Sequence, residues 1–259
     1  MTLPQSPPAA VSQRFSGIRA IVTGGASGIG AATVQMLLDG GAQVASLDVA
    51  PCGALNGSIE IKADVGDPDV GSAVVEAVEA LGGLDVLVNN AGVGAVGTIE
   101  SSGDDIFKRL YDVNVLGVVR VTRGALPYLR ESSCASVVNT CSVSAQIGLP
   151  ERAAYSASKG AVLALTMAMA TDCLTDDIRV SCVAPATVSS PWVGRLLEAA
   201  DDPERMRADL EARQPTGRMV SPREVAAAIC FLASPESGSV TGTVLNVDGG
   251  WKTLRPGQP

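Results

Sequence analysis

Seven short apolar segments rich in Val and Ile recur along the chain, separated by longer stretches of mixed character. Inside these segments the apolar residues do not alternate cleanly with polar ones. Strands that are buried on both faces of a parallel sheet have this pattern. We therefore predict strands at residues 19–22, 43–47, 58–61, 85–88, 135–139, 179–183 and 243–247.

The stretches between the predicted strands carry helix signals. Ser27-Gly28 is expected to open a helix that reaches Leu38. Asp67 is expected to be the N-cap of the next helix, with Pro68 in its first turn and Leu81 near its end. Because strands and helices alternate at this spacing, we predict a single doubly wound, Rossmann-like α/β domain with a seven-stranded parallel sheet flanked by helices.

The two ends of the chain differ in character. Residues 1–16 contain three prolines and no apolar core segment, which predicts a flexible N-terminal tail and not a signal peptide. Residues 17–259 are expected to form the domain. The longest apolar run, 161–170, is too short to cross a bilayer. We therefore expect a cytoplasmic protein that does not bind membranes.

The composition is that of an ordinary globular protein, with 46% hydrophobic and 18% charged residues. A chain of 259 residues buries enough surface to fold without a disulfide or a metal. The formal net charge is -8, and the basic residues are scattered. This balance lacks the positive surface expected of a nucleic-acid-binding protein.

Six cysteines and the absence of histidine restrict the possible chemistry. The cysteines form no C-x-x-C pair, and several lie in apolar stretches, so reduced thiols that pack as small hydrophobic side chains are expected. A chain without histidine cannot use an imidazole base, and a zinc dehydrogenase is disfavoured. We expect no metal site.

A glycine-rich turn, TGGASGIG at 23–30, follows the first predicted strand. Glycines permit positive φ and let the backbone approach a pyrophosphate, and the helix N-terminus that follows favours an anion. Glycines also make ordinary tight turns, but the strand before this one and the helix after it favour a dinucleotide site. The cofactor contacts expected here are Gly24, Ser27, Gly28, Ile29 and Gly30.

Asp48 falls at the end of the second predicted strand. A carboxylate in that place accepts hydrogen bonds from both ribose hydroxyls of adenosine and repels a 2′-phosphate. No Arg or Lys lies within the glycine-rich turn or directly after Asp48. The sequence therefore favours NAD over NADP, although a solvated aspartate at a strand end would give the same pattern.

Tyr155 and Lys159 are four residues apart in a stretch of strong helix character, so they share one helix face. A tyrosine is a poor base at its reference pKa of about 10, and a nearby cation lowers that pKa. In a chain without histidine, this pair is the best available acid/base. The Y-x-x-x-K spacing alone also occurs between surface residues of ordinary helices.

Several motifs, in order, resemble the short-chain dehydrogenase/reductase family over about residues 19–251, which is nearly the whole chain. They are the turn at 23–30, Asp64-Val65, Asn89-Asn90-Ala91-Gly92, Asn114 within Asp112-Val113-Asn114-Val115, Ser142, and Tyr155 with Lys159. The resemblance implies a Rossmann-like domain that usually assembles as a homotetramer.

The resemblance also implies a role for each matched residue. Ser142 would hold and polarise the substrate oxygen, and Tyr155 would give or take the hydroxyl proton as a hydride moves. Lys159 would lower the pKa of Tyr155 and bind the nicotinamide ribose. Asn114 would hold a water that links Lys159 to solvent, unless it only satisfies backbone groups inside its helix. The other implied cofactor contacts are Asp64, Val65, Asn90, Ala91, Gly92, Pro185, Val188 and Ser190.

The chain departs from the family pattern in two places. The family commonly has Pro-Gly where this chain has Pro185-Ala186, which puts the path of that loop in doubt. Ser190 stands where a threonine is usual, and it keeps the hydroxyl. Cys141, beside Ser142, is expected to pack in the interior, because no neighbouring group in the sequence would make it a thiolate.

The stretch from about 186 to 219 corresponds to the variable lid over the substrate. It is similar to a subgroup that contains type-2 3-hydroxybutyrate dehydrogenase and 2-keto-3-deoxy-L-fuconate dehydrogenase. Arg195 and Arg213 in this stretch match arginines of the subgroup, as does Arg152. By resemblance, these three arginines would bind a substrate carboxylate, although solvated surface arginines are the alternative.

These observations favour an NAD-dependent dehydrogenase of a small hydroxy or keto acid or an acidic sugar. Ser142, Arg152, Tyr155, Arg195 and Arg213 would bind the substrate. One alternative is a dehydrogenase or reductase of a neutral sugar, polyol or ketone. The other is a nucleotide-binding protein without catalysis, against which the intact set of Asn114, Ser142, Tyr155 and Lys159 argues.

Overall fold

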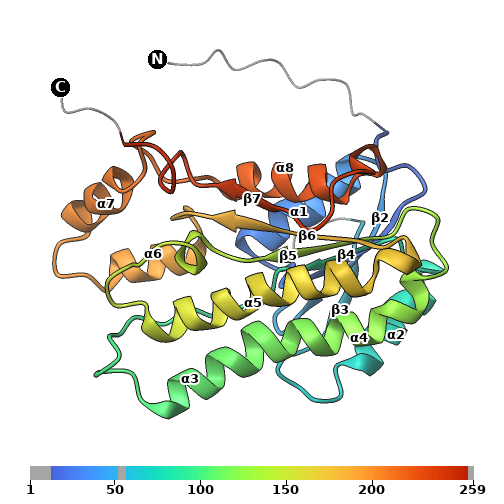
Figure 1. Ribbon diagram of the computed structural model, residues 1–259, viewed down its shortest axis with the longest axis horizontal. Coiled ribbons are helices and arrows are strands. Elements are labelled where there is room, and N and C mark those ends of the chain that lie inside the picture. The colour runs from blue at the N-terminus through green and yellow to red at the C-terminus, as the bar shows by residue number, and fades with distance from the viewer. Residues whose placement is uncertain (1–12, 52–56, 256–259) are drawn as a thin grey trace.

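A seven-stranded sheet in the order β3-β2-β1-β4-β5-β6-β7 organises the chain (Figure 1). The computed structural model describes residues 13–51 and 57–255. Every pair of neighbouring strands is parallel. The strands are β1 (Arg19–Thr23), β2 (Gln43–Asp48), β3 (Ile59–Lys62), β4 (Val86–Asn89), β5 (Ser136–Thr140), β6 (Arg179–Pro185) and β7 (Val244–Val247). All seven predicted strands are confirmed, with ends that differ by at most two residues.

Helices cover both faces of this sheet, as predicted. They are α1 (Gly28–Asp39), α2 (Gly71–Leu81), α3 (Asp104–Tyr111), α4 (Gly117–Leu129), α5 (Ala153–Asp172), α6 (Pro191–Glu198), α7 (Pro203–Ala212) and α8 (Pro222–Ala233). A π-helical turn, η1 (Asp112–Leu116), joins α3 to α4, and the short 3-10 turns are η2 (Val143–Ala145), η3 (Leu174–Asp176) and η4 (Pro235–Ser237). No helix in the described ranges is long and apolar enough to cross a membrane.

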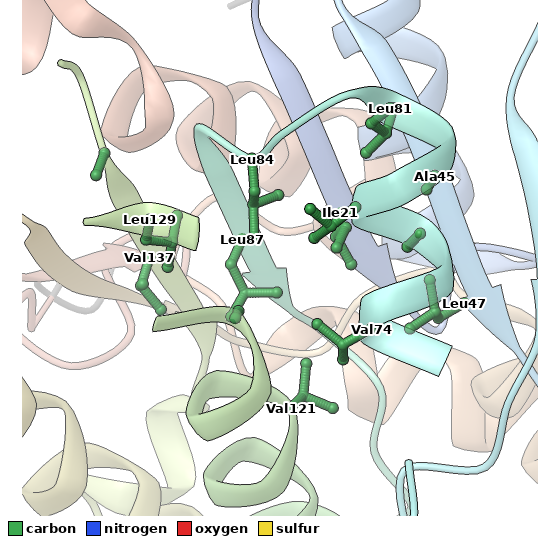
Figure 2. Packing of buried hydrophobic residues seen from close by; sticks show 14 of the residues in the cluster. Ile21, Ala45, Leu47, Val74, Leu81, Leu84, Leu87, Val121, Leu129 and Val137 are labelled. Atoms are coloured by element: carbon green, nitrogen blue, oxygen red, sulfur yellow. The ribbon is translucent and has the colours of Figure 1, made fainter. Parts of the chain in front are cut away.

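Two apolar cores lie on opposite faces of the sheet. On one face, side chains of β1, β2 and β4 pack against α2 and α4; Figure 2 shows Ile21, Leu47 and Leu87 there with Val74 and Val121. On the other face, a second cluster joins the sheet to α1 and α8. Because both faces are covered, the strands are apolar along their whole length, which explains why their sequences do not alternate.

The strand order reverses beside β1, which has β2 on one side and β4 on the other. The loops after β1 and β4 therefore leave the sheet in opposite directions and open a crevice at the carboxyl ends of the strands. Ligands of open α/β sheets bind in such a crevice.

Two expectations about element boundaries were wrong. Asp67 is not the N-cap of α2, which begins at Gly71 after Val70. Its side chain instead accepts a hydrogen bond from Asp69 N at 2.9 Å, so the Asp-Pro sequence forms a turn before the helix.

The domain also begins before residue 17. Residues 1–12 of the expected tail lie outside the described residues. Phe15, however, is 2% exposed in the core beside α1 and α8, and its N–H donates to the Gly40 carbonyl at 2.8 Å. The aromatic ring of Phe15 gives that short segment enough apolar surface to pack.

Candidate active site

A cavity of about 830 Å³ lies at the carboxyl edge of the sheet. The residues predicted to bind cofactor or substrate all line it except Gly30, and the predicted catalytic residues Ser142, Tyr155 and Lys159 line it as well. Gly30 and Asn114 lie just behind the lining. Segments far apart in the sequence thus meet at one crevice, where the parallel topology places the ends of their strands.

The glycine-rich turn brings β1, β4 and α1 into close contact. Gly24 has φ of +67°, and a Cβ there would lie 2.9 Å from Ala91 Cα. A Cβ on Gly30 would collide with the Gly24 carbonyl oxygen. These two glycines therefore allow α1 to start directly against the turn, which brings its N-terminus to the cavity.

The N-terminus of α1 suits a pyrophosphate. Its first turn has no acidic side chain, and Ser27, the N-cap, makes no side-chain capping hydrogen bond. Free N–H groups and the helix dipole favour an anion at such an end. At the neighbouring edge, Asp48 lines the cavity while its carboxylate accepts from Ala26 N at 2.9 Å and Ala50 N at 3.0 Å.

Asn90 lines the cavity and also makes hydrogen bonds within the protein. Its side-chain amide donates to the carbonyls of Thr23 and Gly24 at 3.1 and 3.2 Å. It also accepts a hydrogen bond from the Thr140 hydroxyl at 3.4 Å. In this structure Asn90 fastens the glycine-rich turn to β4 and β5, so its side chain shapes the cofactor crevice from behind.

Ser142, Tyr155 and Lys159 come together from β5 and α5. The Ser142 Oγ caps η2 and accepts from both the N–H and the hydroxyl of Ser144, at 3.2 and 3.0 Å. Two incoming donors leave the Ser142 proton free to point into the cavity, which Tyr155 lines as well. The Lys159 Nζ lies 5.9 Å from the Tyr155 ring centroid and donates to the Thr140 carbonyl at 2.7 Å.

Burial and nearby charge have opposite effects on the pKa of Tyr155. Burial raises the pKa of Tyr155, whereas the hydrogen bond from Ser142 and the charge of Arg152 oppose that rise. Burial also lowers the pKa of Lys159. The Lys159 ammonium lies 5.9 Å from the Tyr155 ring centroid, and its expected effect on the tyrosine pKa stays a prediction.

Asn114 lies in the π-helical turn η1 and is 1% exposed. Its amide donates to the Val93 carbonyl at 2.9 Å and to Ser158 Oγ at 3.1 Å, and its carbonyl accepts from Val93 N at 2.8 Å. The side chain therefore satisfies backbone groups of the loop after β4 and not of its own helix. A Cβ on Gly92 would lie 3.1 Å from Asn114 Oδ1 and 3.5 Å from Lys159 Nζ, so this glycine leaves open the space where a nicotinamide ribose would lie.

Cys141 packs in the interior as expected, in an apolar cluster with Val115, Val162 and Cys182. Its thiol donates to the Lys159 carbonyl at 3.3 Å. The hydrogen bond with Cys182 and the charge of Lys159 lower the pKa of Cys141, although burial opposes them. Sequence separation hid this contact, because Cys182 comes from the adjacent strand β6.

Ala186 fits the loop after β6. Its φ is not in the left-handed region, and its N–H donates to the Val247 carbonyl at 3.1 Å. The alanine therefore costs no backbone strain here. Val188 forms a bridge with Val220, and the Ser190 hydroxyl is the N-cap of α6, accepting from Val193 N at 3.4 Å.

The lid end of the cavity is lined by Arg152, Arg195 and Arg213. Arg152 is half-buried, and both burial and the charge of Arg213, which lines the same cavity, lower the pKa of Arg152. Neither forms an ion pair with any residue in the described ranges. Arg195 and Arg213 are largely exposed, which places them at the mouth of the cavity.

Several lining residues were missed from the sequence, among them Gly94, Ser144, Leu149, Trp192 and Trp251. One signal was available: the chain has only two tryptophans, and both line this cavity. A rare aromatic residue in a lid segment indicates a pocket residue, because aromatic side chains are common in ligand pockets.

Comparison with known proteins agrees with this geometry. A family model described as enoyl-(acyl carrier protein) reductase matches residues 24–252. L-Fucose dehydrogenase of Mus musculus is 39% identical over 92% of this chain and 89% of its own. Cis-4-hydroxycyclohexanecarboxylate dehydrogenase of Sinomonas cyclohexanicum is 35% identical over 94% of this chain and its full length. The ligand-free structure of Thermoplasma acidophilum aldohexose dehydrogenase superposes with a TM-score of 0.90 at 35% identity, covering 96% of this chain and 99% of that one.

Proposed function

Because the chain belongs to the short-chain dehydrogenase/reductase family, a family of nicotinamide-dependent oxidoreductases, we propose that it transfers a hydride between NAD and a small hydroxy or keto acid or acidic sugar. One observation carries the acidic substrate: Arg152 and Arg213 line the same cavity, the charge of Arg213 acts on Arg152, and neither has an ion-pair partner in the described ranges. A half-buried cation is costly without a counter-ion, and a carboxylate fits two guanidinium groups bidentately.

The choice of NAD rests on Asp48. Its carboxylate lines the adenosine end of the cavity, where it would bind the ribose hydroxyls and repel a 2′-phosphate. The first turn of α1 would hold the pyrophosphate, and Lys159 would bind the nicotinamide ribose beside Gly92. When bound, the nicotinamide supplies or accepts the hydride.

The remaining chemistry is a proton transfer at the Tyr155 hydroxyl. In alcohol oxidation the Tyr155 oxygen accepts the proton of the substrate hydroxyl, and in ketone reduction it returns that proton. The Ser142 hydroxyl, with its oxygen already occupied by Ser144, donates toward the same point and orients the substrate oxygen. The charge of Arg152 stabilises the phenolate form that oxidation requires.

A neutral sugar is the second candidate substrate. It is favoured by the mouse relative, which is an L-fucose dehydrogenase, and by the structural likeness to an aldohexose dehydrogenase. The relative that acts on cis-4-hydroxycyclohexanecarboxylate favours the acid. The two candidates are distinguished by measuring NAD reduction, as absorbance at 340 nm, with hydroxy acids, aldonates and neutral sugars. If the proposal holds, the substrate with the highest kcat/KM is acidic.

The proposed assembly is a cytoplasmic homotetramer. Apolar side chains are exposed on several helices, including Leu116 at 43%, Met167 at 39% and Phe231 at 44%. The edge strand β7 is only partly covered along its length. Contacts between copies would cover these surfaces, and sedimentation equilibrium of the full chain measures the assembly directly.

A further inference from the structure

The Trp192 indole lies against the backbone of Gly94, in the loop after β4. Trp192 is the second residue of α6 in the lid, and it packs against a small apolar cluster of Val193, Leu197, Leu210 and Met219. A Cβ on Gly94 would lie 2.8 Å from Trp192 Cζ2 and 3.1 Å from Cε2. Gly94 has no positive φ, so what matters at this position is the missing side chain, which lets the indole lie on the backbone.

Arg152 lies against the same indole. Its guanidinium carbon is 5.9 Å from the centroid of the Trp192 ring, within the range of a cation–π contact. The backbone of Arg152 forms a bridge with Gly97, and Gly97 N donates to the Glu151 carbonyl at 2.9 Å. Glu151 itself has φ of 54°, a conformation that non-glycine residues adopt at a cost and that is found at functional sites.

Three segments thus converge on one side chain: the loop after β4 through Gly94, the segment before α5 through Arg152, and the lid through Trp192. All three residues line the cavity. The Arg152 guanidinium has no carboxylate partner in the described ranges; it is positioned by its contact with the indole and by a hydrogen bond that it donates to the Glu151 carbonyl at 2.9 Å. The remaining flat surface of the indole is apolar.

We propose that Trp192 is a specificity-determining and positioning residue, which holds Arg152 at the cavity wall and presents an apolar surface to the part of the substrate next to its carboxylate. The preferred substrate then carries its anionic group on a hydrocarbon or ring face that lies against the indole. This inference rests on the acidic substrate of the proposed function.

The test uses two probes without an oxidisable hydroxyl, cyclohexanecarboxylate and its neutral counterpart cyclohexanecarboxamide. Each is titrated by calorimetry into the NADH-saturated protein, after the NADH affinity and the melting temperature of each variant have been measured. The variants are Trp192→Ala, Trp192→Phe and Gly94→Ala. Gly148→Ala is the matched control, because a Cβ there meets nothing within 4 Å and Gly148 lies in the segment before Arg152.

The parent should bind the carboxylate about tenfold more tightly than the amide, as expected for hydrogen bonds to a charged group. Trp192→Ala should lose roughly tenfold in carboxylate affinity, the upper range of a desolvated cation–π contact. Gly94→Ala should lose affinity in the same direction, since its methyl displaces the indole. Trp192→Phe should retain most of the preference, and Gly148→Ala all of it.

Two failures can be told apart. If the parent prefers the carboxylate and Trp192→Ala keeps that preference with unchanged affinity, the inference about Trp192 is overturned while the acidic substrate stands. If the parent binds both probes equally, the acidic substrate of the proposed function is overturned, and the role given to Arg152 falls with it.

Discussion

The cavity has two ends that are built by different means. At the adenosine end, the surface is largely backbone: the turn after β1, the start of α1 and the loop after β4, fitted so closely that a single methyl on Gly24 or Gly30 has no room. At the lid end, the surface is side chains, with arginines and a tryptophan carried by α6, α7 and the segment before α5. Gly94 is the exception at the lid end, because there the backbone itself forms the surface, against which the Trp192 indole packs.

This difference separates recognition of the cofactor, which the family shares, from recognition of the substrate, which differs among its members. A backbone surface at the edge of a buried sheet tolerates few changes, so it recognises a constant ligand such as a dinucleotide. Side chains on short helices with a small core of their own can change without loss of the domain. The fold and the family therefore establish nicotinamide-dependent chemistry, while the substrate depends on a few lid-end residues.

Tyr155→Phe should have the largest effect, because it removes the hydroxyl that is proposed to exchange a proton with the substrate. The ring keeps its packing while the acid/base is lost, so turnover should fall by ~10²–10⁴-fold. NADH affinity should stay close to that of the parent. Steady-state kinetics and an NADH titration check both, and turnover close to the parent rate would contradict the assignment of Tyr155.

Gly30→Ala should damage the adenosine end alone. Its Cβ would collide with the Gly24 carbonyl oxygen, so α1 must shift, and overpacking of this kind costs about 1–3 kcal/mol. We expect a lower melting temperature and weaker NADH binding. Gly160→Ala, on α5 beside Lys159, adds a methyl that meets nothing within 4 Å, so it should neither lower the melting temperature nor weaken NADH binding. Equal melting temperatures and equal NADH affinities of the two variants would show that the turn has room for a methyl group at Gly30.

Arg213→Ala should affect the lid end alone. It removes one of the guanidinium groups that line the lid end of the cavity, and kcat/KM for an acidic substrate should fall by roughly tenfold, about the value of a hydrogen bond to a charged group. NADH affinity should be unaffected. Arg195→Ala is the comparison, because Arg195 is an exposed arginine that lines the same cavity. If Arg213→Ala leaves kcat/KM for the acid unchanged, the pair does not bind its carboxylate.

Asp48→Ala should have the smallest effect, a narrowing of the preference for NAD over NADP by a few-fold, the value of one or two hydrogen bonds. The loss of ribose hydrogen bonds weakens NAD, and the loss of charge removes repulsion of the 2′-phosphate. Asp48→Asn removes the charge but keeps an acceptor for Ala26 N, so it separates the two contributions. Side-by-side kcat/KM values with both cofactors measure this, and a parent that prefers NADP would refute the assignment.

The sheet and the order of its elements could be predicted because buried parallel strands leave a strong local signal. Asp48 and Ser142 were placed correctly at strand ends for the same reason. The start of α2 was missed because an aspartate before a proline favours a turn as well as a helix N-cap. The hydrogen bond from Asp69 N to the Asp67 side chain shows that the turn forms.

Contacts between distant segments could not be predicted. The effect of Cys182 on Cys141 depends on the register of β5 with β6, and the use of Asn90 to fasten the glycine-rich turn depends on the packing of β4 against β1. The contact of Arg152 with Trp192 joins segments forty residues apart. The sequence identified residue types that could do chemistry, but not which of them meet.

The π-helical turn η1 has a consequence for insertions and deletions. Since α3, η1 and α4 follow one another without a break from Asp104 to Leu129, they form one rod with a wide turn in the middle. Removing one residue from the wide turn would restore a regular helix, but it would rotate α3 against α4 by about 100°, since an α-helix has 3.6 residues per turn. Leu110 and Val121 could then no longer both face the interior, and Asn114 would turn away from Val93. A deletion or insertion of one residue, which a surface loop would tolerate, would therefore disrupt both the packing and the site here. The number of residues in this rod matters as much as their identity.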